Sequence, residues 1–164
     1  LPVVGRLHDA CSVDDREAVA YWGQYCLASR ETRELRQEEL NRARALVSLL
    51  RDLDVAHADD WSDTLSHCQA APFALAAVQW GIARDDCLLG YAWAWLENLV
   101  AAAIKLVPLG QTEGQRALLR LAERLPAACR EAAALEDDAV GAGTPALAIA
   151  SACHETQYTR LFRS

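Results

Sequence analysis

The sequence predicts an all-α fold, an antiparallel bundle of helices around one central buried apolar helix. Alanine and leucine dominate the apolar 52% of the chain while β-branched residues are sparse, which favours helices over strands. Apolar residues recur at helical spacing in several segments, and no segment has a clear strand pattern. Between residues 87 and 107 only Glu97, Asn98 and Lys105 are strongly polar, as expected of a helix surrounded by others.

The length of 164 residues corresponds to one domain, residues 1–164, which is large enough to bury a core. The chain opens on Leu1 and Pro2 and contains no methionine, so we expect a native N-terminal segment to be missing in front of it. The formal charge of −7 argues against a nucleic-acid-binding or anionic-membrane surface, because both need clustered basic residues. We therefore expect proteins or small molecules as partners.

Five helices are expected in the first half of the chain. Residues 1–10 resemble the end of a helix, and Ser12 followed by Asp15 is a capping pattern for a helix over about 13–29. A long helix over 30–53 has an apolar stripe that we expect to face inward: Leu35, Leu46, Leu49, Leu50 and Leu53. After a short helix near 61–68, Pro72 begins an apolar, internal helix.

Gly81 closes that internal helix, following the preference for proline at a helix start and glycine after its end. The central helix over 86–107 follows. Thr112 and Gln115 form a capping box for a helix through Arg124, and Pro126 starts another to about Leu135. Thr144 caps a last helix from Pro145 to about Ala152.

The central helix is apolar enough to raise the question of a membrane span. A Glu-Asn pair in mid-span is expensive in a bilayer, and Asp85 and Asp86 before the helix and Pro108 after it are typical of a buried helix in a water-surrounded domain. We expect no membrane association.

Tyr91, Asn98 and Lys105 recur every seven residues and so share one line on the central helix. Two interpretations are open: the line seats a partner or another helix, or its polar groups bond carbonyls of a neighbouring loop. Two interpretations are also open for the dense mixture of Arg and Glu over 30–44. It is either a solvated face or a docking ledge for a partner.

Six scattered cysteines without a Cys-x-x-Cys motif indicate a reducing, cytoplasmic compartment and no disulfide framework. Cys153 and His154 are adjacent, but neighbours on a helix point about 100° apart and would not pair for catalysis. His67 and Cys68 are the closest potential metal ligands, yet this spacing resembles no closed tetrahedral site. The sequence therefore predicts no enzyme, no resident cofactor and no intrinsic metal site.

The C-terminal stretch is too apolar to remain loose in water, because Tyr158, Leu161 and Phe162 lie in it beside Arg160 and Arg163. We expect it to dock on its own domain or on another protein.

Four segments resemble the urease accessory protein family UreF, in the same order and with similar separations. They are Ser-Arg-Glu-Thr-Arg-Glu-Leu-Arg at 29–36, Gly-Tyr-Ala-Trp-Ala-Trp-Leu-Glu-Asn at 90–98, Lys-Leu-Val-Pro-Leu-Gly-Gln at 105–111, and the C-terminal segment 148–164. There are two departures: the family's N-terminal helical segment with a Leu-Pro-x-Gly motif is lacking, and Cys153 stands where many relatives have arginine.

The resemblance implies an all-helical, non-enzymatic chaperone that joins the accessory proteins UreD (UreH) and the GTPase UreG on apo-urease for nickel delivery. On this basis the chain regulates the GTPase step and couples it to metallocentre assembly, and it forms a homodimer. Carrying the motifs over identifies Lys105 and Gln111 as residues that position a partner-facing loop. It also identifies Tyr158, Arg160, Leu161, Phe162 and Arg163 as residues that order on the UreD-type partner, with Glu31, Arg33 and Arg36 as further partner-binding candidates.

Two hypotheses compete with the scaffold. In one the chain is itself a nickel-binding metallochaperone that uses its own His and Cys ligands. In the other it is a hydrolase that uses Cys153 and His154.

Overall fold

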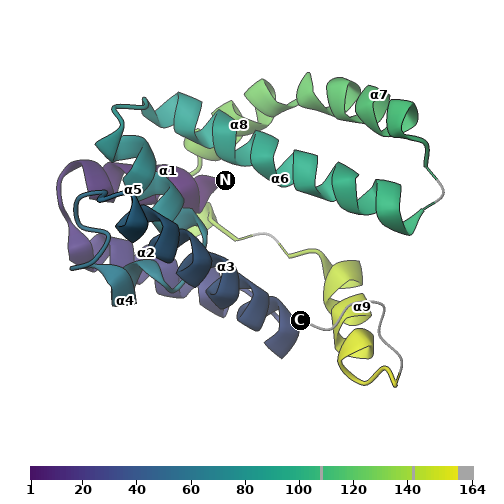
Figure 1. Ribbon diagram of the computed structural model, residues 1–164, viewed down its shortest axis with the longest axis horizontal. Helices are drawn as coiled ribbons and strands as arrows, with labels where there is room; N and C mark the ends of the chain where they lie inside the picture. Colours follow the sequence, from purple (N-terminus) through teal and green to yellow (C-terminus); the bar gives the residue numbers. More distant parts are fainter. Residues whose placement is uncertain (108, 142, 159–164) are drawn as a thin grey trace.

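The computed structural model describes residues 1–107, 109–141 and 143–158, and every regular element within these ranges is helical. The elements are α1 (Pro2–Ser12), α2 (Arg16–Ala28), α3 (Arg33–Asp52), α4 (Ser62–Leu65), α5 (Ala70–Gln79), α6 (Arg84–Leu106), α7 (Gln111–Ala122), α8 (Leu125–Ala133), the short 3₁₀ helix η1 (Asp137–Ala139) and α9 (Pro145–Glu155). The predicted all-α class is confirmed, and Figure 1 shows the arrangement.

Side-chain caps set the starts of α2 and α3. The Asp15 carboxylate accepts a hydrogen bond of 2.9 Å from the backbone N–H of Ala18, and the Thr32 hydroxyl accepts one of 3.3 Å from Leu35. The prediction that Ser12 caps α2 is wrong, because Ser12 ends α1 and its hydroxyl donates to the Asp9 carbonyl at 2.6 Å.

The predicted capping box of α7 is also absent. Thr112 lies inside α7, which begins at Gln111 after Gly110 without a side-chain cap. The Gly110 backbone is extended there, with φ −67° and ψ 152°, and therefore supplies the non-helical residue that a helix start requires.

The helix enclosed on all sides is α5, as its apolar sequence predicted. Its buried residues are Ala70, Ala71, Pro72, Ala74, Leu75, Ala76 and Ala77. The small alanine side chains let α1, α2, α3 and α6 all contact this one short helix. At its end Gly81 adopts a φ of +68°, the left-handed conformation that glycine takes without strain. The main core therefore lies around α5.

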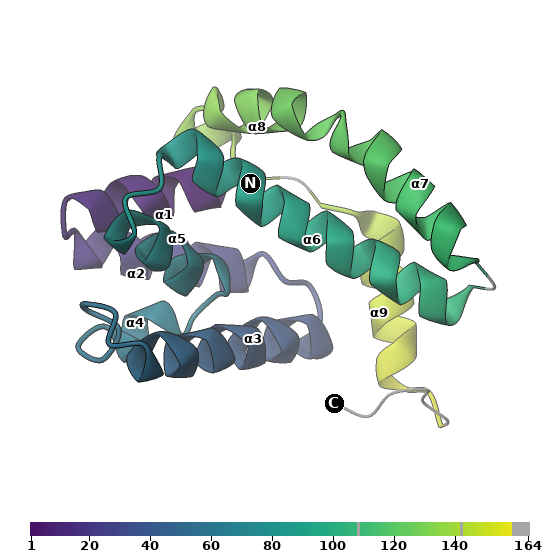
Figure 2. The ribbon, with the colours of Figure 1, turned by 45° about the horizontal axis from the view of Figure 1, so that its top comes forward.

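The prediction that the 86–107 helix is buried nearly all round is wrong. In α6 the buried residues are Cys87, Leu88, Ala92, Leu96 and Val100, a single stripe. The reason is length: 23 residues extend for about 35 Å, far beyond the cluster of α1, α2 and α5, and only α7 continues antiparallel beside the second half (Figures 1 and 2).

Helix α6 consequently exposes apolar side chains to solvent on more than one side. Trp93, Trp95, Leu99 and Leu106 are 39%, 59%, 52% and 57% exposed, respectively. By length and apolar composition alone α6 would be able to cross a membrane. The core helices of soluble proteins in general meet the same two criteria. In this fold α6 instead contacts α1, α5, α7 and α8.

The contact between α6 and α7 depends on Gly114. A Cβ atom at this position would overlap the Ile104 side chain and lie 3.5 Å from a methyl group of Val100. Because glycine has no side chain, α7 approaches α6 closely enough to form a small second core of Leu96, Val100 and Leu118.

The inward stripe of α3 differs from the predicted leucines. Leu50 is buried and Leu46 is partly buried, but Leu49 and Leu53 are 51% and 55% exposed. The buried residues of α3 are Glu39, Ala43, Val47 and Leu50, at helical spacing. The stripe thus begins at a charged residue, which apolar patterning does not detect.

We predict that alkaline pH destabilises the fold through two buried thiols. Burial raises the pKa of Cys11 to about 12 and that of Cys87 to about 11, from an ordinary value of 9.0. Above about pH 9 the unfolded chain therefore loses thiol protons that the folded chain keeps, and the free energy of unfolding falls as the pH rises towards these values. Urea unfolding at a series of pH values measures this slope.

The alanine variant Cys11→Ala is expected to have a shallower alkaline slope than the unsubstituted chain. Cys153→Ala, which removes an exposed thiol, is the matched control and should keep the original slope. Equal slopes for Cys11→Ala and the unsubstituted chain would contradict the prediction.

Candidate functional site

A cleft of about 350 Å³ lies between α3, α6 and the start of α9, and we call it the α3–α6 cleft. Its lining residues come from segments far apart in the sequence: Ser29, Arg30, Glu31, Leu35, Glu38, Glu39, Arg42, Gln69, Tyr91, Trp95, Asn98, Leu99, Ala102, Thr144 and Leu147. Its lining joins charged groups from α3 with apolar groups from α6, a combination that suits a protein partner.

Glu39 is the centre of the polar side of this cleft. Its side chain is only 8% exposed as a residue, and the guanidinium of Arg30 lies 2.7 Å from one carboxylate oxygen. The other oxygen accepts a hydrogen bond of 2.8 Å from the backbone N–H of Gln69, at the start of α5. A buried carboxylate is tolerated when it is paired in this way, and it also faces the positive end of the α5 helix dipole.

The same pairing perturbs the neighbouring titratable groups. Burial, the largest single effect, acts to lower the pKa of Arg30, but the charge and hydrogen bond of Glu39, together with Cys26 and Tyr91, outweigh it, so the net shift is upward. Burial raises the pKa of Tyr91, and the negative charge of Glu39 adds to that effect. Arg30 thus stays positively charged and Tyr91 stays neutral under ordinary conditions.

The opposite side of the cleft is the exposed face of α6. Tyr91, Trp95, Asn98 and Ala102 lie at spacings of four, three and four residues, so they share one helical face. The Asn98 side chain donates a hydrogen bond of 2.8 Å to the Ala94 carbonyl of its own helix and is exposed. Neither a loop nor another helix therefore occupies the Asn98 position.

Lys105 does not line the cleft with Tyr91 and Asn98. It lies in the last turn of α6, and Gln111 begins α7, so both exposed residues flank the turn that joins these helices. The structure thus brings Lys105 and Gln111 to the same end of the α6–α7 pair, beyond the compact part of the chain (Figure 2).

The three candidates before and within α3 are all exposed. Glu31 lines the cleft, whereas Arg33 and Arg36 do not. Arg36 donates a hydrogen bond of 2.6 Å to the Arg30 carbonyl, which keeps it at the edge of the same segment. The docking ledge was predicted over residues 30–44. Within it, Glu31 and the residues of α3 that line the cleft face α6.

A group of polar contacts attaches α9 to the start of α3. The hydroxyl groups of Thr32 and Ser151 lie 2.7 Å apart, His154 Nδ1 lies 2.6 Å from a Glu34 carboxylate oxygen, and the backbone N–H of Glu34 donates to Glu155 at 2.9 Å. His154 and Glu155 thus position α9 within the molecule. Cys153 is exposed and His154 pairs with Glu34, so the two do not form a catalytic pair.

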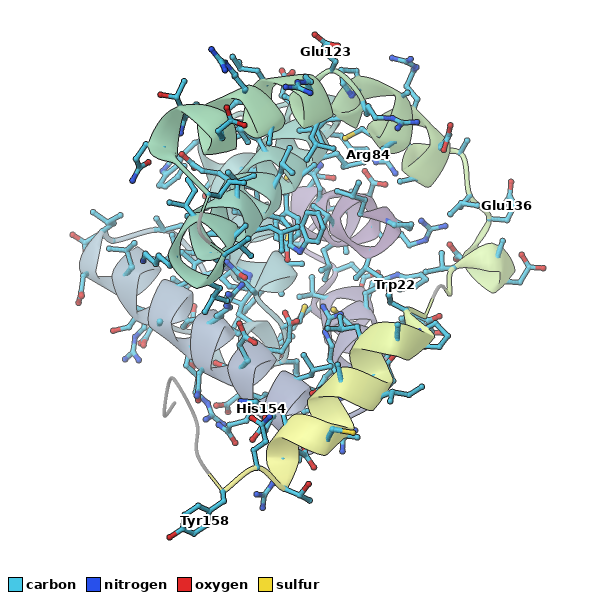
Figure 3. All side chains as sticks on the ribbon, turned by 90° about the vertical axis from the view of Figure 1, so that its right-hand side faces the viewer. Trp22, Arg84, Glu123, Glu136, His154 and Tyr158 are labelled. Carbon is cyan, nitrogen blue, oxygen red and sulfur yellow. The ribbon has the colours of Figure 1, made fainter. Side chains whose placement is uncertain are left out.

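Figure 3 shows His154 against α3 and Tyr158 pointing away from the molecule. Tyr158 is fully exposed, which leaves its ring available to another surface. Arg160, Leu161, Phe162 and Arg163 lie outside the described residues.

The potential metal ligands do not gather in the described part of the chain. No group of three or more His, Cys, Asp or Glu side chains there is placed to hold a metal ion. His67 donates to the Thr64 carbonyl at 2.9 Å, while the neighbouring Cys68 is completely buried in the core. The hypothesis of a metallochaperone that uses its own ligands therefore gains no support from these residues.

Three important residues were missed by the sequence reasoning: Glu39, Trp95 and Leu147. The alignment of Trp95 with Tyr91 and Asn98 on one helical face was a usable signal, because it places an aromatic side chain on the predicted polar line. Glu39 and Leu147 carried no such signal, since their roles depend on segments that are distant in the sequence.

The chain is similar to known proteins of one family. The family model named UreF matches residues 1–122. The urease accessory protein UreF of Alcanivorax borkumensis is 50% identical over 170 residues, an alignment that covers the whole chain and 74% of the relative. The UreF proteins of Alkalilimnicola ehrlichii and Pseudomonas putida (strain W619) are 51% and 49% identical, covering 100% and 99% of this chain and 72% and 73% of the relatives.

We predict that Glu39→Ala destabilises the chain by about 2 kcal/mol, because it leaves Arg30 and the Gln69 N–H without their carboxylate. Glu38→Ala is the matched control, since Glu38 pairs with Arg42 in an exposed i,i+4 contact, and a change within about 0.5 kcal/mol is expected there. Urea unfolding measures both values. Equal effects of the two substitutions would show that the buried pairing has no special weight.

Proposed function

Because the chain belongs to the UreF family of urease accessory proteins, we propose that it is a scaffold that joins UreD (UreH) and the GTPase UreG on apo-urease. In this role it regulates the GTP-dependent assembly of the nickel metallocentre, with nickel as the cargo. The observation that carries the proposal is the identity of about 50% along the entire chain. The family consists of accessory proteins, so the chain is not an enzyme.

The surface properties of the molecule support a scaffold. Trp95 and Leu99 are more than half exposed beside the charged groups of α3, and a partner that covered them would remove apolar surface from water. Aromatic residues surrounded by polar groups are typical of protein interfaces. We therefore propose the α3–α6 cleft, including Glu31, as one partner-binding surface, with Arg33 and Arg36 at its edge.

A second proposed surface is the α6–α7 turn with Lys105 and Gln111. Lys105 is the only lysine of the chain and is exposed at the end of α6. Within residues 1–164 an amine-reactive cross-linker therefore finds one lysine side chain, that of Lys105. The third proposed surface is the C-terminal segment with Tyr158, Arg160, Leu161, Phe162 and Arg163, which we assign to the UreD-type partner.

We also propose that the chain forms a homodimer and acts in the cytoplasm. The exposed apolar side chains of α6, among them Trp93 and Leu106, support association, and the six free cysteines fit a reducing compartment. Sedimentation velocity over a range of concentrations tests for the homodimer, and a monomer throughout that range would contradict this proposal.

If the chain is a scaffold, we expect that deletion of residues 157–164 weakens capture of UreD while the fold survives. This deletion retains His154 and Glu155, whose contacts with Glu34 attach α9 to α3. We expect UreD binding at least about tenfold weaker than for the full chain, a loss of about 1.4 kcal/mol, in a pull-down with purified partner. Circular dichroism controls for the fold, and undiminished capture by the truncated chain would remove the segment from the proposal.

For the α6–α7 turn, we expect Lys105→Glu to weaken assembly with UreG and UreD without changing the free energy of unfolding, since the residue is exposed. Arg120→Glu, an equal change of charge on the exposed part of α7, is the matched control. Co-purification of the complex from a strain that expresses both partners gives the readout. If both variants assemble as the unsubstituted chain does, Lys105 is not part of the interface.

A further inference from the structure

Two cysteines of the chain lie in contact although they are distant in the sequence. Cys26 is in the last turn of α2, and Cys68 lies just before α5. Cys26 packs against the core cluster that includes Cys68, the two thiols influence each other's ionisation, and both cysteines are free. Cys68 is completely buried in the main core, whereas Cys26 is partly exposed, so the pair has an inner and an outer member.

A cation stands beside the outer thiol. Arg30 Nη2 lies 3.8 Å from Cys26 Sγ, one helical turn further along the chain, and the same Nη2 and the neighbouring Nε lie 2.7 and 2.9 Å from Glu39 Oε2. Because Glu39 fixes the position of Arg30, the positive charge stays next to the sulfur. A guanidinium in such a position favours the thiolate, which is the reactive form of cysteine.

The proton affinities of the two sulfurs differ accordingly. Interaction with the Cys68 thiol lowers the pKa of Cys26 and, together with Arg30, outweighs burial and the Glu39 charge, which act in the opposite direction. The same interaction, with burial, raises the pKa of Cys68 well above its ordinary value. By contrast, burial, with smaller contributions from Cys87 and Asp14, raises the pKa of Cys11 to about 12, which makes that thiol unreactive.

We propose that Cys26 and Cys68 form an oxidation site that peroxides convert into a reversible intramolecular disulfide. The Cys26 thiolate attacks one oxygen of hydrogen peroxide, so that an S–O bond forms, the O–O bond breaks and the hydroxide that leaves takes up a proton. Cys68 sulfur then attacks Cys26 sulfur. The S–S bond forms, the S–O bond breaks, and the departing hydroxide takes the Cys68 proton to give water.

In sum, two thiols and one hydrogen peroxide yield one disulfide and two waters, and a dithiol reductant reverses the change. The bond would join the end of α2 to the segment before α5. Gln69, adjacent to Cys68, and Arg30 both line the α3–α6 cleft, so oxidation acts at the polar side of that cleft. The chemistry of the thiols does not depend on the proposed scaffold function.

The experiment treats the full reduced chain with hydrogen peroxide near neutral pH, blocks the remaining thiols under denaturing conditions and maps the digested peptides by mass spectrometry. The expected product is a peptide pair linked through Cys26 and Cys68 that separates on reduction. Cys153, the exposed thiol, is the internal reference for uncatalysed oxidation. If Cys26 oxidises no faster than Cys153, or if no linked pair forms, the proposal is wrong.

Two variants test the parts of the site separately. In Cys68→Ala the second step is blocked, and the sulfenic acid of Cys26 should accumulate and react with dimedone. Arg30→Gln should slow oxidation of Cys26 about threefold, because the cation that favours the thiolate is then lost. Arg44→Gln removes the same charge from an exposed position of α3 and should leave the rate unchanged.

Circular dichroism establishes that each variant is folded. Should Cys68→Ala fail to fold, Cys26→Ala serves instead, because the loss of all peroxide-dependent linkage to Cys68 is then expected. Equal oxidation rates for Arg30→Gln and Arg44→Gln would overturn the assigned role of Arg30.

Discussion

Close packing around α5 is the constraint on which the rest of the structure depends. Ala70, Ala71, Ala74 and Ala77 are almost completely buried and present only methyl groups to α1, α2, α3 and α6. Helices that pack through alanines approach each other closely, so larger side chains at these positions would push the surrounding helices apart. The positions of α3 and α6, and with them the cleft between these helices, follow from contacts with this short helix.

The length of α6 then determines what the molecule exposes. The first part of α6 packs on the core through Cys87 and Leu88, whereas the second part packs only through one stripe on α7. A helix with an apolar circumference but a single buried stripe leaves tryptophan and leucine side chains in water. We propose that partners of this accessory protein bind to this exposed surface, because association would remove it from solvent.

One buried carboxylate links the core to the cleft. Glu39 pairs with Arg30 at the end of α2 and accepts a hydrogen bond from the start of α5, so it joins three elements at one point. Through Arg30 it also fixes the charge beside Cys26. The stability of this corner, the polar side of the cleft and the reactivity of the thiol pair therefore depend on the same side chain.

The amino-acid sequence by itself determined the local features of the chain. These are the helices over most of their lengths, the end of α5 at Gly81 and the four motifs of the UreF family. These features rest on helical periodicity and backbone conformation within a few residues. Tertiary structure alone decided that α5 rather than α6 is enclosed, that Glu39 faces inward and that Cys26 meets Cys68. The physical reason is that burial depends on which helices lie alongside, and an apolar stripe has the same sequence whether or not another helix covers it.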